Sequence, residues 1–336
     1  MIYIQKTTPF FLLFLLAIIA CQEDSFDPRP GIICRGIPGD PVDDYIEIQE
    51  FPTYQYPVFN PLNPDEFAYA RYDLDTIFPW VDEREIHIYN LNTGEDRSIY
   101  HGPLWSGMDW GVNGWLLINR ADNQVWKIKA DGDSLTQLTF SGINEDARWN
   151  ADATRFVAWR SDNSIYEVRI YDSNGYFLHL VETGFSNGAW APSAHFLSSI
   201  RFDHTKDFFS VASYDSSDNI ISQYTFPRKN EYAWEVRHDP RDEEVFYATT
   251  SDYRFLRIHF DKGIQKNLSG GCETDKFIHF SVSPVGDQIL ADRASIHFAD
   301  TTLKDGTQEK NKVLHLYTTI WLMDENGNKK RQVELP

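Results

Sequence analysis

Short apolar or alternating runs recur along most of the chain, and turn-forming pairs such as Asp-Gly and Asn-Gly separate them. No stretch keeps the 3.6-residue apolar period of a long amphipathic helix. One anchor position recurs about every 45 residues, at Phe59, Trp110, Trp149, Trp190, His238 and Val282. Because the three tryptophans share this repeat spacing, we expect them to fill equivalent core places.

Each repeat has the same order of elements after its anchor: a turn, an apolar strand, an alternating strand, a second turn and a closing strand. The apolar strands are predicted at Phe67–Arg71, Trp115–Arg120, Arg155–Arg160, Phe196–Phe202, Val245–Thr249 and Gln288–Arg293. With the strand that ends at the anchor, each repeat has four strands in about 45 residues, which is typical of a β-propeller blade. Residues 45–336 are therefore predicted to form an all-β fold, a six-bladed β-propeller of four-stranded antiparallel blades.

The anchor regions resemble the TolB-type, WD-like propeller repeat, whose consensus runs Trp-Ser-Pro-Asp-Gly before an apolar strand. Ser283-Pro284-Val285-Gly286 followed by Gln288-Ile289-Leu290 fits this pattern, and so does Trp149-Asn150-Ala151-Asp152. The resemblance covers about residues 56–336 and departs at His238, where Trp is expected. It implies a TolB-like propeller, whereas the function has to come from the site.

Residues 1–20 have the pattern of a secretory signal peptide. Lys6 precedes an apolar run from Pro9 to Ala20, which is too short to span a bilayer as a helix. The end of this segment, Ile18-Ile19-Ala20-Cys21, resembles the lipobox of bacterial lipoproteins. That resemblance implies a diacylglycerol on Cys21, with fatty acyl chains such as palmitate that anchor the chain to a membrane. The alternative is an ordinary signal peptide that ends near a Cys.

Residues 21–44 are rich in Pro, Gly and Asp, which predicts a flexible lipidated tether. Gln22 follows the lipobox Cys, and in the usual sorting scheme of Gram-negative lipoproteins it favours the outer membrane. We expect an outer-membrane, lipid-anchored protein on the periplasmic or the cell-surface side. In that oxidising compartment Cys34 and Cys272 either form a disulfide or remain two free thiols.

The chain is strongly acidic, with 31 Lys and Arg residues against 50 Asp and Glu residues and a net charge of −19 over 336 residues. Such a surface repels phosphate backbones, which argues against a nucleic-acid partner. We expect a monomeric propeller whose membrane contact is made by its N-terminal lipid.

Two connections, Tyr72–Arg84 and Ala294–Tyr317, are predicted to be long loops in the first and last repeats, which are neighbours in a closed propeller. Long loops on a rigid scaffold often carry function. Their aromatic and His residues make up the candidate binding surface: Tyr72, Phe78, Trp80, His297 and Phe298. Alternatively, these side chains pack inward and hold their own loops.

Catalytic motifs are weak in this sequence. The stretch Gly184-Phe185-Ser186-Asn187-Gly188 matches G-x-S-x-G, but a propeller strand follows it where a hydrolase needs a helix. The ten His residues include no HExxH pair. We therefore predict no catalytic residue, no metal ligand and no cofactor. A structural Ca²⁺ is the remaining alternative, held by Asp73 with Asp75 or by the group Asp239, Asp242 and Glu243.

The functional prediction is a non-catalytic docking platform for an envelope protein or glycan. The alternative is a carbohydrate-active enzyme, a lyase or hydrolase, because some lyases are built on related repeats. The two hypotheses differ in what they require of the channel mouth. Convergent His and acidic side chains with an Arg or Lys would favour the enzyme, and a flat aromatic face would favour docking.

Overall fold

The computed structural model is built of β-strands throughout its described part. Described are residues 46–49, 52–72, 83–162, 165–183, 188–193, 197–203, 208–217, 219–227, 231–251, 254–269, 275–302, 306 and 308–336. The chain divides into two units, Met1–Ile33 and Cys34–Pro336, and every described residue belongs to the second. Within these ranges there is no helix, and so none that is long and apolar enough to cross a membrane.

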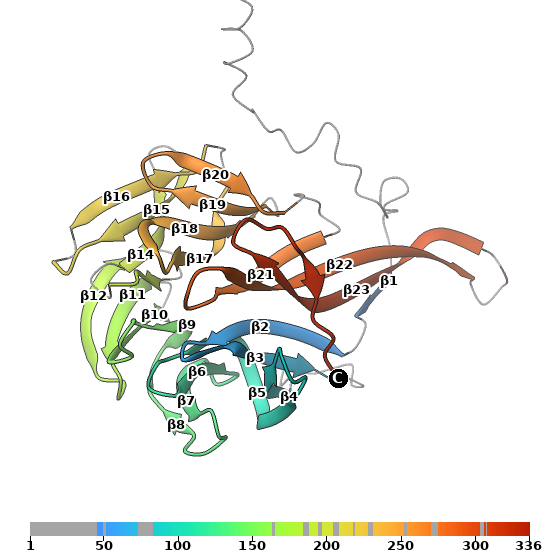
Figure 1. The fold of residues 1–336 in the computed structure, drawn as a ribbon, viewed down its shortest axis with the longest axis horizontal. Coiled ribbons are helices and arrows are strands. Elements are labelled where there is room, and N and C mark those ends of the chain that lie inside the picture. The colour runs from blue at the N-terminus through green and yellow to red at the C-terminus, as the bar shows by residue number, and fades with distance from the viewer. Residues whose placement is uncertain are drawn as a thin grey trace, which may run out of the picture. The chain divides into compact units, whose positions relative to one another are not determined.

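The strands form five sheets, each built from strands that are consecutive in the sequence apart from β1 (Figure 1). The first sheet has seven strands: β2 (Thr53–Asn60), β3 (Asn63–Tyr72), β4 (Glu83–Asn90), β5 (Asp96–Trp110), β6 (Trp115–Arg120), β7 (Gln124–Lys129) and β8 (Thr136–Gln137). The second sheet contains β9 (Ile143–Trp149), β10 (Arg155–Asp162), β11 (Ile165–Asp172) and β12 (Phe177–Thr183). The third contains β13 (Ala189–Trp190), β14 (Leu197–Asp203), β15 (Phe208–Tyr214) and β16 (Ile220–Thr225).

The fourth sheet contains β17 (Ala233–Asp239), β18 (Asp242–Thr250), β19 (Phe255–His259) and β20 (Gly263–Asn267). The last contains β21 (Asp275–Val282), β22 (Gln288–Thr302), β23 (Gln308–Asp324) and β24 (Arg331–Gln332), together with β1 (Ile46–Gln49). Neighbouring strands pair antiparallel, apart from β1. The prediction of an all-β fold made of four-stranded antiparallel units is therefore confirmed.

The seven-stranded sheet consists of two four-stranded units that share β5. The first half of β5 pairs with β4 as far as Pro103, and the second half pairs with β6 from Leu104 to Trp110. Because the chain passes from one unit to the next without leaving the strand, these two units are counted as one sheet.

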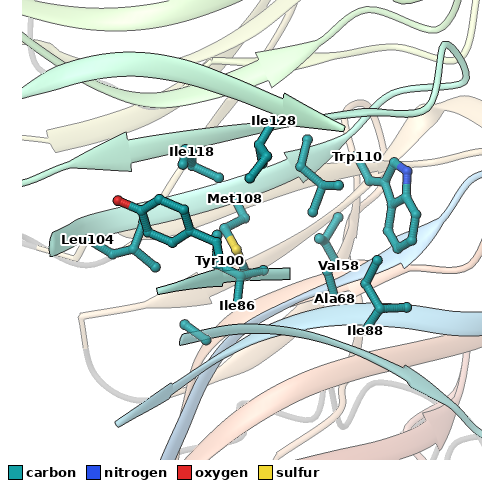
Figure 2. Packing of buried hydrophobic residues seen from close by; sticks show 12 residues of the cluster. Val58, Ala68, Ile86, Ile88, Tyr100, Leu104, Met108, Trp110, Ile118 and Ile128 are labelled. Atoms are coloured by element: carbon teal, nitrogen blue, oxygen red, sulfur yellow. The ribbon is translucent and has the colours of Figure 1, made fainter. Parts of the chain in front are cut away.

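Apolar clusters join each four-stranded unit to the next. One of them contains residues from both halves of the seven-stranded sheet, with Ile86 and Tyr100 facing Ile118 and Ile128 (Figure 2). Further clusters connect the second half of that sheet to the β9–β12 sheet, and then each sheet to its successor. Each fully buried aliphatic or aromatic side chain contributes about 1.5–3 kcal/mol, so these layers supply most of the stability.

The first and last sheets also pack against each other. Phe67 and Tyr69 of β3 share a cluster with Leu290 and Ile320 of the last sheet. β1 precedes the first sheet in sequence but pairs in parallel with β23 of the last, where Ile46 lies opposite Val313. β1, in which apolar and polar residues alternate, thus adds an extra strand at this junction.

One predicted loop is wrong. Most of Ala294–Tyr317, expected to be irregular, lies in the extended hairpin of β22 and β23, where His297 pairs with His315 and Phe298 with Leu314. The β-branched and aromatic residues of this segment suit a pleated strand, and pairing satisfies their backbone polar groups. The length of the connection indicated a loop, but strand pairing continues through most of it.

Candidate functional site

The first strands of five four-stranded units, β2, β5, β9, β17 and β21, carry a β-bulge at the same place in the repeat. The residue three positions before the anchor is Tyr56 in β2, Gly107 in β5, Asp146 in β9, Glu235 in β17 and His279 in β21. In all five strands the pairing register shifts at or beside that residue. A bulge turns a side chain away from the regular pleat and is often found next to functional sites. The same β-bulge, at or beside the position three residues before the anchor, therefore recurs in five strands.

Two of these bulges hold a residue other than glycine in the left-handed backbone region. Tyr56 has a φ of 55° and Asp146 a φ of 51°, and the equivalent Gly107 has a φ of 42°. Holding a residue other than glycine in this region costs on the order of 1–3 kcal/mol, and such strain concentrates at functional sites. We call the first strand of each four-stranded unit its inner strand. The strain at Tyr56 and Asp146 makes the bulge positions of the inner strands a candidate site.

Buried ion pairs connect three of the inner strands. Arg148 Nη2 lies 3.0 Å from Glu235 Oε1, with both side chains about 95% buried. Arg237 Nε donates to the same Glu235 oxygen at 2.9 Å, and Arg237 Nη1 donates to Asp109 Oδ1 at 2.9 Å. The second oxygen of Asp109 accepts a hydrogen bond of 2.7 Å from the Trp149 amide. Each charged side chain thus has an oppositely charged partner, either on another strand or on the same strand.

A second group of contacts surrounds His279. Its Nδ1 lies 2.7 Å from Asp292 Oδ2, and its amide donates to Asp292 Oδ1 at 2.8 Å. The Tyr56 amide donates to the same carboxylate at 3.1 Å, and the rings of Tyr56 and His279 have centroids 4.1 Å apart. These residues, the ion pairs and the bulge residue Asp146 together form the inner-strand cluster: Tyr56, Asp109, Asp146, Arg148, Glu235, Arg237, His279 and Asp292.

Burial and charge move several pKa values in and beside the inner-strand cluster. Burial raises the pKa of Glu145 to about 7, with a further contribution from Asp146. Burial also raises the pKa of Asp146, although Arg148 opposes it. For Glu235, burial is outweighed by Arg237 and Arg148, which lower its pKa. For His279, burial is outweighed by Asp292, which raises its pKa. Burial therefore favours the neutral forms of Glu145 and Asp146, whereas neighbouring charges favour the ionised forms of Glu235 and His279.

A cavity of about 190 Å³ lies next to the ion pairs, where the inner strands end in their turns. Asp109 and Arg237 contribute to its lining. Aromatic anchors and the prolines two positions after the anchors form other parts of it: Phe59, Trp110, Trp190, Pro61, Pro240 and Pro284. This volume is smaller than the 300–1,000 Å³ of ordinary small-molecule sites, so it fits one side chain or one sugar ring. Of the three tryptophans expected in the core, Trp110 and Trp149 are buried, whereas Trp190 is half-buried and lines this cavity.

The residues of the predicted binding surface have different outcomes. Tyr72 lies at the end of β3 with 7% of its surface exposed. Its hydroxyl donates to Gln55 Oε1 at 3.0 Å, and the Arg84 guanidinium carbon lies 3.8 Å from its ring centroid. The structure thus gives Tyr72 the packing role. His297 and Phe298 lie on β22, with only their backbone described. The remaining predicted sites lie outside the described residues: Phe78, Trp80, Cys21, Cys34, Cys272 and residues 184–187 of the G-x-S-x-G motif.

The described part of the chain contains no group of three or more His, Cys, Asp and Glu residues placed to hold a metal ion. Of the two acidic groups considered for Ca²⁺, Asp73 and Asp75 lie outside the described residues. Asp239 instead binds guanidinium groups, and its nearest distance to Arg241 Nε is 2.9 Å. The carboxylate oxygens of Asp239 are therefore already engaged by cations.

The inner-strand cluster was not predicted from the sequence, although a signal for it existed. Asp109, Arg148 and Arg237 each come directly before an anchor, and Asp146 and Glu235 come two positions earlier on the same strand face. Charged residues at alternate positions of a strand that should be buried are unusual unless they are paired. Aligning the six anchors and reading backward would have found the cluster.

Comparisons with known proteins support the fold. No family model matches the sequence. No curated protein matches it either. Among solved structures, a protein from Agrobacterium tumefaciens assigned as TolB is similar, with a TM-score of 0.58 and 16% identity over 74% of this chain and 87% of that one.

Two further structures show the same architecture. The β-propeller domain of a trilobed protease from Pyrococcus furiosus, which has an open velcro topology, matches with a TM-score of 0.52 and 11% identity over 84% of this chain and 98% of that one. A nidogen/laminin complex matches with a TM-score of 0.51 and 10% identity over 64% of this chain and 79% of that chain. Identities this low show the fold alone: the chain has a TolB-like β-propeller fold.

Proposed function

We propose that this protein is a non-catalytic docking platform of the cell envelope, which binds an envelope protein or glycan through the cavity beside its inner-strand cluster. The observation that carries this proposal is the pairing of the charged groups. Arg148, Glu235, Arg237 and Asp109 neutralise one another, and His279 is held by Asp292. A network of this kind fixes a shape, and aromatic and proline side chains at its opening offer contact area to a partner.

The proposal includes six blades arranged in a ring. Counting the two halves of the seven-stranded sheet separately gives six four-stranded units in the described residues. Six apolar clusters join successive units, including the one between the last sheet and the first. The pairing of β1 with β23 supports the junction of the two ends. In this arrangement the inner-strand cluster lines the central axis.

The proposal places the propeller at the outer membrane. A diacylglycerol on Cys21 and the flexible segment 21–44 would hold the domain near the lipid surface, with a disulfide between Cys34 and Cys272 fixing the end of the tether. Replacing Cys21 by Ala should release the protein from the membrane fraction, and unchanged sedimentation would contradict lipidation. A change of mass on reduction of the purified protein, measured after alkylation of free thiols, tests the disulfide.

The docking function is tested by affinity purification of the lipidated protein from membranes, followed by mass spectrometry. We expect a stable partner with the wild-type protein and at least tenfold less of it with Trp190→Ala, which removes one wall of the cavity. Phe140→Ala is the matched control, because Phe140 is 76% exposed and does not line the cavity. Equal recovery with both variants would place the partner elsewhere.

One observation favours a second function, a carbohydrate-active lyase or hydrolase. His279, Asp146 and Glu235 come together with Arg148, and Glu145 has a pKa of about 7. A carboxyl that titrates near neutrality suits general acid–base catalysis. The test is turnover of a panel of bacterial and plant polysaccharides by wild-type protein and by Glu145→Gln. Turnover that Glu145→Gln abolishes, together with recovery of no stable partner, would reverse the order of the two functions.

A further inference from the structure

A larger cavity of about 520 Å³ lies outside the inner-strand cluster, on the surface of the seven-stranded sheet. Arg97 of β5, Trp115 of β6 and Lys129 of β7 line it, so three consecutive strands contribute one side chain each. Trp115 and Lys129 are cross-strand partners in the β6–β7 pairing, which fixes their separation. None of these residues lines the smaller cavity beside Arg237, so the two cavities are separate sites.

The charge around this cavity is opposite in sign to that of the whole chain. The Lys129 ammonium lies 5.6 Å from the Trp115 ring centroid, and the Lys127 ammonium lies 4.9 Å from it. Arg97 and Lys129 are the two basic residues of the cavity lining, and Asp131 is its acidic residue. The chain has 50 acidic and 31 basic residues, so a cavity at which basic side chains outnumber acidic ones differs from its average surface.

Donor groups remain for a ligand after the internal contacts are counted. Arg97 Nη1 donates to the Ala130 carbonyl at 2.7 Å, which orients the guanidinium and uses one of its five N–H donors. Lys127 Nζ donates to the Ser173 carbonyl at 2.7 Å, so its position is fixed as well. A Cβ added at Gly114 would meet nothing within 4 Å, which shows that this part of the wall is open.

We propose that this cavity binds an acidic saccharide, with the sugar carboxylate at Arg97 and Lys129 and the sugar ring against Trp115. Arg and Lys pair with carboxylates through charge-assisted hydrogen bonds, and an indole offers a flat apolar surface to a pyranose ring. The volume lies within the range of small-molecule sites and admits one or two sugar units. The acidic remainder of the chain repels the same polymer, which confines it to this site and makes binding sensitive to salt.

The first test compares two hexasaccharides that differ only in their carboxylates. Full-length, detergent-solubilised protein is titrated calorimetrically with β-1,4-linked mannuronate hexamer and with β-1,4-linked mannohexaose. We expect the mannuronate to bind at least ten times more tightly than the neutral sugar, with affinity falling as NaCl rises from 50 to 300 mM. Equal affinities, or no binding of the mannuronate by folded protein, would overturn the proposal. Inorganic phosphate or hexaglutamate that competes as well as the mannuronate would overturn the saccharide assignment.

The second test locates the site. Lys129→Glu and Arg97→Gln should each weaken mannuronate binding, the first by at least tenfold and the second by at least threefold. Lys262→Glu is the matched control, because it makes the same change of charge at an exposed position. Lys262 lies in the turn between β19 and β20, which is equivalent to the turn between β7 and β8 in the first sheet. Equal weakening by Lys262→Glu would show a general charge effect and contradict the site. Thermal unfolding midpoints check that all variants are folded. If Lys129→Glu does not fold, Arg97→Gln still tests the site.

Discussion

The layers between the sheets and the inner-strand cluster are both buried, but they are built from opposite chemistry. Phe67 and Ile118 have no exposed surface and pack in the apolar clusters of their layers. Arg148 and Glu235 are nearly as buried, yet both carry charge and depend on each other. Apolar burial is non-directional and tolerates small shifts, whereas a buried ion pair is favourable only in one geometry.

This difference separates what holds the fold together from what gives it a specific surface. Replacing a buried ion pair by apolar residues of similar size is often neutral or stabilising, so stability alone does not explain Arg148, Glu235 and Arg237. The strained backbone of Tyr56 and Asp146 at the same level also opposes folding. These unfavourable features come together from strands β2, β5, β9 and β17, which supports a binding role for the inner-strand cluster.

The largest expected effect comes from breaking an apolar layer. Phe67→Ala removes a fully buried ring from the junction of the first and last sheets and should lower the free energy of unfolding by about 3–5 kcal/mol. Urea unfolding followed by far-UV circular dichroism measures it. A loss below 1 kcal/mol would show that this junction does not contribute to stability.

Breaking the ion-pair network should have the next largest effect. Arg148→Met leaves Glu235 with Arg237 as its remaining ion-pair partner, so we expect a loss of about 3 kcal/mol, the lower end for a broken buried pair. The double variant Arg148→Met/Glu235→Leu should lose less than the sum of the single variants, because no carboxylate is then left with reduced pairing. Additive losses in this double-mutant cycle would contradict direct coupling.

A smaller effect should appear as a pH dependence at Glu145. Its pKa rises from 4.5 to about 7 on folding, so the folded state holds the proton more tightly than the unfolded state. The resulting stabilisation is complete below pH 4.5 and is lost as the pH rises through 7. Glu145→Gln cannot ionise, so its stability relative to wild type should increase by roughly 1–2 kcal/mol from pH 5 to pH 8. Urea unfolding at both pH values measures the change, and parallel profiles would contradict it.

The smallest effect is expected at an exposed apolar residue outside both regions. Leu62 is 71% exposed in the turn between β2 and β3, so Leu62→Ala should change the free energy of unfolding by less than about 0.5 kcal/mol. The same urea series provides the measurement. A loss of more than 1 kcal/mol would contradict the view that buried apolar side chains stabilise the fold and exposed ones do not.

Much of the fold was predictable because propeller repeats are local. The predicted strand Trp115–Arg120 matches β6 at both ends, and the predicted strand at Arg155 begins where β10 begins. Short turns fix these boundaries: Asn113-Gly114 precedes β6 and Asp152-Ala153 precedes β10, so each hairpin is completed within a few residues. The β22–β23 hairpin was missed because a long span between two strands looks like a loop until its halves are paired.

The candidate site was harder to predict because its members are far apart in sequence. Arg148 and Glu235 are 87 residues apart, and Tyr56 and Asp292 are 236 apart, yet both pairs are hydrogen-bonded. Within one repeat, each residue looks like an isolated charge or ring on a strand. These residues come together only because the first strands of successive sheets place equivalent positions close to one another.

The sequence by itself determined the four-stranded unit, its repetition and its turns, because these depend on interactions between residues close along the chain. It also determined the acidic charge and the alternation that made Ile46–Gln49 a strand. The tertiary structure alone decided which strand β1 joins, which charges neutralise one another and where Arg97, Trp115 and Lys129 open a cavity. These features depend on distances between separate strands, and packing of whole sheets sets such distances.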